Sequence, residues 1–139
     1  MASVETHAPN GKQRPLSPHL QIYSPLINMV MSIVHRITGV ALYLGTMLLA
    51  WWLIAAATGP QYFGFVSTLL GSPIGLLVLF GYTWALAHHM LGGLRHLLWD
   101  TGRGFNLGTV NLLSWGTLIG SLALTAAVWV PALLKKGIL

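Results

Sequence analysis

The chain has 139 residues, of which 55% are hydrophobic and only 6% are charged. A soluble domain has about 25% charged residues, so this chain has too few to cover a water-facing surface. Its seven Lys and Arg residues outnumber the two acids, but they are scattered and do not form the basic stripe typical of nucleic-acid binding. Cysteine is absent, which excludes disulfides and thiolate-held metals. The composition therefore predicts an integral membrane protein in which any metal ligand is a histidine.

The first 26 residues are polar and are interrupted by prolines. They lack the apolar core of a cleavable signal peptide, and they lack the arginine-rich, amphipathic pattern of a transit peptide. We expect residues 1–26 to form a cytoplasmic segment ahead of the membrane domain. A start without a targeting segment favours a bacterial inner membrane over the mitochondrial inner membrane.

Three apolar stretches are long enough to cross a bilayer, which takes about 20 helical residues. They run over residues 27–57, 73–99 and 110–134, and Thr58-Gly59-Pro60 and Asp100-Thr101-Gly102 separate them. Glycines within the spans permit close contacts between helices. We therefore expect an all-α integral membrane domain of three transmembrane helices over residues 27–139, packed against another membrane chain.

The positions of Lys and Arg predict the orientation of these spans. The 58–72 connection has no charged residue, and Lys135 and Lys136 follow the third span on the same side of the membrane. The opposite side, which holds the N-terminus and the second connection, has five basic residues: Lys12, Arg14, Arg36, Arg95 and Arg103. Because cytoplasmic loops carry an excess of Lys and Arg, we expect this richer side to be cytoplasmic.

The second span contains histidines suited to hold a haem. His89 and His96 are seven residues apart and share a helix face, but about 10 Å of helix separates them, so they cannot ligate the same iron. His89 lies about 15 Å from the Asp100 stop and is the better buried ligand. The second ligand must then come from another helix, from His35 or from a second chain. A hydrogen bond to a neighbouring helix is the alternative role for His89.

The polar residues near the end of this span have different expected roles. Arg95 and His96 lie close to the interface, where they could contact haem propionates or Asp100. His88 points about 100° away from His89, and a hydrogen bond to a neighbouring helix or to interface water is the favoured role for it. Helix packing, or hydrogen bonds to neighbouring helices, would also account for these residues.

A second polar cluster lies early in the first span. Ser32, His35 and Arg36 are three and four residues apart, so they occupy adjoining parts of one helix face. A hydroxyl donor and a fixed positive charge inside a membrane suit a quinone, whose carbonyl oxygens accept hydrogen bonds while its tail lies in lipid. The alternative is that Arg36 extends to lipid phosphate and Ser32 bonds to its own backbone.

Three segments of the chain carry a resemblance to a known family. They are Arg14-Pro-Leu-Ser-Pro-His-Leu-Gln-Ile-Tyr23, Ser32-Ile-Val-His-Arg-Ile-Thr-Gly39 and His89-Met-Leu-Gly-Gly-Leu-Arg-His-Leu-Leu-Trp-Asp100. They resemble the segments "RPLSPHL-x-IY", "S-x-x-HR-x-[ST]-G" and "H-x-x-x-G-x-RH-x-x-x-D" of the large cytochrome b anchor subunit of succinate dehydrogenase, the membrane part of respiratory complex II. The resemblance spans nearly the whole chain.

The resemblance implies roles for individual residues. It makes His89 an axial ligand of haem b, with the opposite ligand supplied by the small membrane anchor subunit. It places Ser32 and Arg36 in the ubiquinone site and His35 near a haem propionate, which assigns His35 a role other than axial ligation. The motif does not use the position of His88, so we expect His88 to be structural.

The implied activity belongs to a complex. Succinate would be oxidised in a flavoprotein subunit, and electrons would reach ubiquinone through an iron–sulfur subunit, so that this chain holds no succinate site. The segment from Arg14 to Tyr23 would contact that soluble part. Two alternatives are the anchor of a fumarate reductase and a small membrane transport component in which His and Arg line a polar path. A reduced-minus-oxidised haem spectrum would distinguish the transport component from the anchor.

Overall fold

The computed structural model describes residues 23–135 and 137, and the predictions made for residues 1–22 lie outside this part. Its helices are α1 (Ile27–Thr58), α2 (Pro60–Gly71), α3 (Pro73–Asp100) and α4 (Leu107–Lys135). The helices α1, α3 and α4 are each long and apolar enough to cross a membrane. The predicted all-α membrane fold is confirmed for the described residues, which contain no strand.

The helix α4 begins three residues before the predicted span. The reason is a cap, because the side chain of Asn106 accepts a hydrogen bond from the backbone N–H of Thr109 at 2.8 Å. Such a cap satisfies an N–H group that the first turn of a helix leaves unpaired. The prediction followed hydropathy alone and therefore missed this polar first turn.

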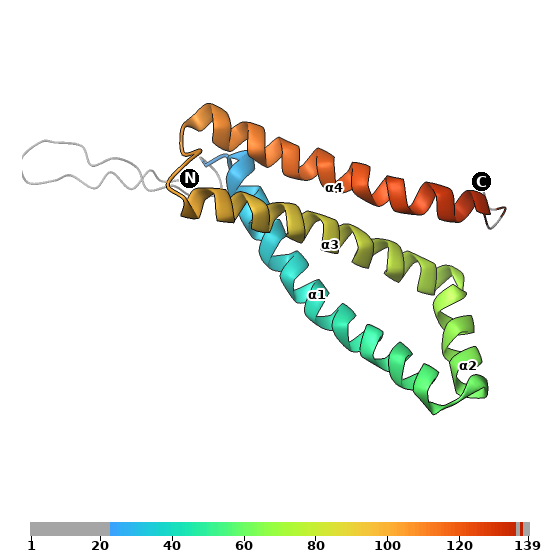
Figure 1. Ribbon diagram of the computed structural model, residues 1–139. Helices are drawn as coiled ribbons and strands as arrows, with labels where there is room; N and C mark the ends of the chain where they lie inside the picture. Colours follow the sequence, from blue (N-terminus) through green and yellow to red (C-terminus); the bar gives the residue numbers. More distant parts are fainter. Residues whose placement is uncertain (1–22, 136, 138–139) are drawn as a thin grey trace, which may run out of the picture.

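The 58–72 connection is mostly helical, which the sequence analysis did not predict. Gly59 has a φ of 148°, a backbone conformation that favours glycine, and Pro60 then starts α2. Ser72 ends this helix and caps α3 by accepting a hydrogen bond from the N–H of Gly75 at 3.1 Å. With 12 residues, α2 is too short to span a bilayer. It joins the separated ends of α1 and α3 (Figure 1).

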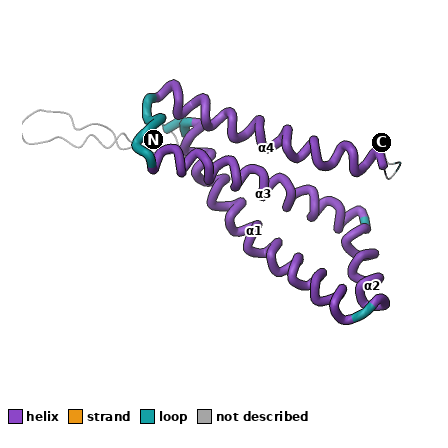
Figure 2. Tube along the Cα trace, in the orientation of Figure 1, coloured by secondary structure: helices purple, strands orange, loops and turns teal. Residues whose placement is uncertain are grey.

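The long helices diverge from one end of the molecule. The start of α1, the end of α3 and the start of α4 lie together at one end, and α2 lies at the other end (Figure 1). The helix α4 runs beside α3, and α1 crosses α3 and then separates from it toward α2. Figure 2 shows that the connections at both ends are short. The end at which α1 and α3 meet contains the histidines described below.

The buried side chains of the bundle are mostly small or polar, whereas its surface is apolar. Large hydrophobic side chains such as Ile37, Leu94 and Leu122 are more than half exposed, as expected for a surface in lipid. Among the described residues, the buried polar or charged side chains are Thr38, His88, Arg95, Ser114, Thr117, Ser121 and Thr125. With the buried hydrophobic residues Met31, Ala55, Val66, Ala85 and Ala87, these polar side chains form the contacts between the helices.

Candidate functional site

Three histidines from two helices meet between α1 and α3. The rings of His35 and His89 are stacked, with centroids 3.9 Å apart and an interplanar angle of 6°. The ring of His96 lies 5.2 Å from that of His35. The structure thus brings together the histidine of the first predicted cluster and two histidines of the second. We call these three residues the histidine cluster.

Glycines make this close approach possible. A Cβ atom added to Gly92 would overlap the ring of His35 at Nδ1, and one added to Gly39 would lie 3.1 Å from Cε1 of His89. Each histidine ring therefore occupies space above a glycine of the opposite helix. By contrast, Gly93 has no atom within 4 Å of its hypothetical Cβ. Of the two neighbouring glycines in the motif, only Gly92 is required for this contact.

The hydrogen bonds of His89 determine which of its ring nitrogens carries the proton. Its Nδ1 lies 3.1 Å from the backbone oxygen of His35 and 3.3 Å from Oγ1 of Thr38. A carbonyl oxygen can only accept, and the Thr38 hydroxyl donates to that same oxygen at 2.9 Å. Nδ1 of His89 must therefore carry the proton. Its Nε2 forms no hydrogen bond to any described residue and keeps a free lone pair.

His88, the next residue, faces α4 and is fully buried. Its Nδ1 lies 3.3 Å from Oγ of Ser121, whose own proton is donated to the backbone oxygen of Leu118 at 2.8 Å. His88 is thus the donor in this pair. It connects two helices, in agreement with the structural role expected for it.

Arg95 lies on the same side of α3 as His88 and not with the histidine cluster. It is 4% exposed, its Nη1 donates to Oγ of Ser114 at 3.2 Å, and its guanidinium carbon lies 5.0 Å from the centroid of the Trp99 ring. Of the three residues predicted to contact propionates, the structure brings His35 and His96 together and leaves Arg95 apart.

The polar face of α4 was not found by sequence reasoning. Its buried residues recur at intervals of three or four positions and are Ser114, Thr117, Ser121 and Thr125. This spacing places them on one helix face, toward α3. The periodicity was available in the sequence, but hydroxyl side chains are common in membrane helices and do not by themselves indicate a partner.

Ser32 and Arg36 occupy the first turns of α1. Ser32 is half-buried and Arg36 is exposed. In the same helix Thr46 and Thr58 donate to the backbone oxygen four residues earlier, whereas Ser32 makes no such bond in the described structure. Its hydroxyl is therefore not used by the backbone of its own helix.

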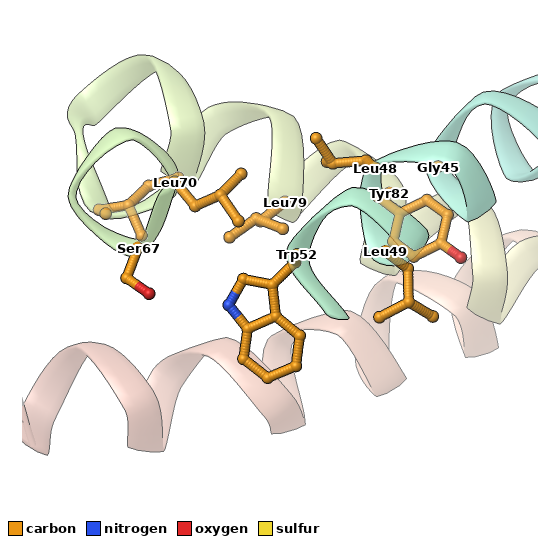
Figure 3. A pocket seen from close by; sticks show the side chains of 10 residues that line it. Gly45, Leu48, Leu49, Trp52, Ser67, Leu70, Leu79 and Tyr82 are labelled. Atoms are coloured by element: carbon orange, nitrogen blue, oxygen red, sulfur yellow. The ribbon is translucent and has the colours of Figure 1, made fainter. Parts of the chain in front are cut away.

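An apolar cavity of about 320 Å³ lies away from these residues, between α1, α2 and α3. Figure 3 shows Trp52 and Tyr82 among the side chains that line it. Its lining is hydrophobic except for Ser67 and the polar atoms of these aromatic residues. Histidine, the residue type predicted to ligate haem here, is absent from its lining.

Comparison with known proteins agrees with the motifs. Residues 10–128 match the family described as succinate dehydrogenase/fumarate reductase transmembrane subunit. This match covers well over half of the chain.

The bacterial relatives match this chain over most of both lengths. The chain is 43% identical over 115 residues to the succinate dehydrogenase cytochrome b556 subunit of Paracoccus denitrificans, covering 83% of this chain and 88% of that one. It is 42% identical over 118 residues to the cytochrome b556 subunit of Rickettsia prowazekii (strain Madrid E), covering 85% and 92%. The mitochondrial cytochrome b560 subunit of Homo sapiens is 39% identical over 99 residues, covering 70% and 59%.

Proposed function

The chain belongs to the succinate dehydrogenase/fumarate reductase transmembrane subunit family, and we propose on that premise that it binds haem b and forms part of a ubiquinone site. The relatives are named as cytochrome b subunits of succinate dehydrogenase, so the chain is a membrane subunit of an enzyme complex. Family membership leaves no support for the transport alternative. The succinate dehydrogenase and fumarate reductase directions share one family description.

The observation that carries the haem proposal is the state of His89. A histidine that ligates a metal usually donates its other ring N–H to a backbone carbonyl or carboxylate, which fixes the tautomer and the ring orientation. His89 has this arrangement, since Nδ1 is held by the backbone oxygen of His35 at 3.1 Å and Nε2 is free. The described residues therefore fit a haem with one ligand from this chain. Haem b, when bound, supplies one-electron transfer.

Among the described residues we propose His89 as the one axial ligand, so the other comes from outside this part of the chain. His35 is unsuited to be the second ligand, because its ring is stacked face to face on that of His89 at 3.9 Å. We therefore propose that the small membrane anchor subunit provides the opposite ligand. We propose that His35 and His96 donate to the propionates.

The quinone part of the proposal rests on Ser32 and Arg36. Both lie at the end of α1 that is near the end of α3 (Figure 1). The hydroxyl of Ser32, which has no hydrogen-bond partner among the described residues, can donate to a quinone carbonyl oxygen, and the guanidinium of Arg36 stabilises negative charge that develops there. With its charge exposed at the bundle surface, Arg36 is accessible to a substrate that approaches through the lipid.

Partners and orientation follow from the same proposal. Electrons would come from a flavoprotein subunit through an iron–sulfur subunit docked on the side that holds the start of α1. That side also holds Arg103, and we propose that it is the cytoplasmic side of a bacterial inner membrane.

The haem proposal is tested by alanine substitution in the assembled complex. His89→Ala should remove the low-spin signal from the reduced-minus-oxidised and electron paramagnetic resonance spectra. His88→Ala is the matched control, because it changes the neighbouring histidine on the face away from α1. An unchanged low-spin spectrum in His89→Ala, with loss of that spectrum in His35→Ala, would show that the assigned ligand is wrong.

The quinone proposal is tested by two activity assays on one preparation. Arg36→Ala removes a charge-assisted donor that contributes about 1.5–3 kcal/mol, so quinone reduction should slow by about ten- to a hundredfold. Ser32→Ala should produce a smaller loss in the same assay. Succinate oxidation with an artificial acceptor that takes electrons from the soluble subunits should remain nearly normal. Equal losses in both assays would assign these residues to assembly, and normal quinone reduction in the double variant would refute the site.

A further inference from the structure

A groove between α3 and α4 is not used by the proposed haem and quinone sites. It has a volume of about 370 Å³, within the range of about 300–1,000 Å³ typical of ligand pockets. Its apolar lining consists of leucines from both helices and Gly116, and its polar lining consists of Arg95 and Thr117. The groove therefore combines a hydrocarbon surface with one cation.

That cation is poorly neutralised. Arg95 is 4% exposed, its Nη1 donates to Ser114 at 3.2 Å, and its Nε is buried without a hydrogen-bond partner among the described residues. An arginine remains charged in proteins. Burial of an ion without a counter-ion costs several kcal/mol, and neither a serine hydroxyl nor the ring of Trp99 supplies a full negative charge.

The described chain has no acid that could pair with Arg95. Its one acid, Asp100, is exposed and follows Arg95 by five residues, which places it about 140° around the helix. The counter-ion must therefore come from outside the described residues.

The groove faces away from the histidine cluster. Leu94, which lines it, follows His89 by five residues and so lies about 140° around α3 from the proposed haem ligand. Leu94 and Leu98 are 56% and 36% exposed. This step rests on the proposed function, because the subunit that supplies the second ligand must cover Nε2 of His89. The opposite face, with the groove, is then left to lipid.

We infer that this groove binds an anionic phospholipid, whose phosphate pairs with the guanidinium of Arg95 and whose acyl chain lies along the leucines. Arg95 precedes the end of α3 by five residues, or about 8 Å, so it lies near the membrane interface. Trp99 and Arg103 at the same end are residue types typical of that interface. An amphiphile with a negative head matches both parts of the groove.

The test uses the assembled complex in nanodiscs that contain either dioleoylphosphatidylglycerol or dioleoylphosphatidylcholine. Native mass spectrometry should show the phosphatidylglycerol retained after transfer to detergent and the phosphatidylcholine lost. Arg95→Gln should weaken that retention by about tenfold or more, as expected for a lost charge-assisted contact. Arg103→Gln is the matched control, because it removes an exposed cation at the same end, and it should retain the lipid.

A second variant keeps the test informative if Arg95→Gln does not assemble. Gly116 lines the groove and has open space around its hypothetical Cβ, so the side chain of Gly116→Leu should start in open space, occupy the groove and reduce lipid retention. Equal retention of phosphatidylglycerol by the wild type and by these variants would overturn the inference. Inorganic phosphate that raises the thermal midpoint of the complex as much as phosphatidylglycerol does would also overturn the inference, because it would indicate a site for a small anion only.

Loss of haem from Arg95→Gln with lipid retained would instead assign Arg95 to a propionate. The haem spectrum of His89→Ala is a separate measurement, so failure of the proposed haem ligand is distinguishable from failure of the lipid site.

Discussion

The two sides of α3 use the same residue types for different purposes. His89 faces α1 and is half-buried, and its Nε2 has no hydrogen-bond partner among the described residues. His88 faces α4 and connects two helices through Ser121; its Nε2 also has no described partner, but it is fully buried. On the α1 side glycines open space for rings, and on the α4 side hydroxyl groups fill the interface. A histidine in a membrane span is therefore a candidate ligand only when its neighbours hold one nitrogen and leave the other open.

Among substitutions that test the difference between the two sides of α3, we expect the largest effect from the glycines between α1 and α3. Gly92→Ala puts a methyl group where the ring of His35 lies, and such overpacking costs about 1–3 kcal/mol. The variant should lower the thermal midpoint of haem release in the assembled complex. Gly93→Ala is the matched control, since it meets open space and gains helix propensity of up to about 1 kcal/mol. Equal destabilisation by Gly92→Ala and Gly93→Ala would show that these glycines matter for the backbone of α3 and not for the space that the ring of His35 occupies.

A moderate effect is expected at Thr38. This residue is 2% exposed and holds both Nδ1 of His89 and the backbone oxygen of His35. Outer-shell partners of metal ligands contribute about 10- to 100-fold to affinity, and the backbone acceptor remains in Thr38→Val, so about tenfold weaker haem retention is expected. Haem content measured during dilution would detect this change, and Thr46→Val on the same helix provides a control. Unchanged retention would leave the backbone oxygen as the sole determinant of the tautomer.

The smallest effect is expected on the α4 side. Ser121→Ala leaves the Nδ1 proton of His88 without its acceptor at 3.3 Å. Polar pairs between membrane helices contribute about 0.6 kcal/mol on average, so stability should fall by about that amount while the haem spectrum stays normal. Reversible unfolding in detergent mixtures would measure the loss. A shifted haem spectrum would instead show that the two sides of α3 are coupled.

The sequence by itself determined that the protein lies in a membrane and that it has three transmembrane helices. Hydropathy, together with stops such as Thr58-Gly59-Pro60, placed the spans within a few residues, because the bilayer imposes a minimum length on any helix that crosses it. The motifs indicated the family, which the match over residues 10–128 confirmed. The spacing of Ser32 and Arg36 also sufficed to place them on one helix face, since that depends only on helix geometry.

Only the tertiary structure decided which partner each side chain meets. Sequence spacing placed Arg95 beside His96, but the packing of α4 against α3 puts the arginine against Ser114 and leaves the histidine near His35. Likewise, the free nitrogen of His89 depends on a backbone oxygen of another helix, 54 residues away in the chain. Such contacts are set by how helices cross, and no pattern within a single helix contains that information.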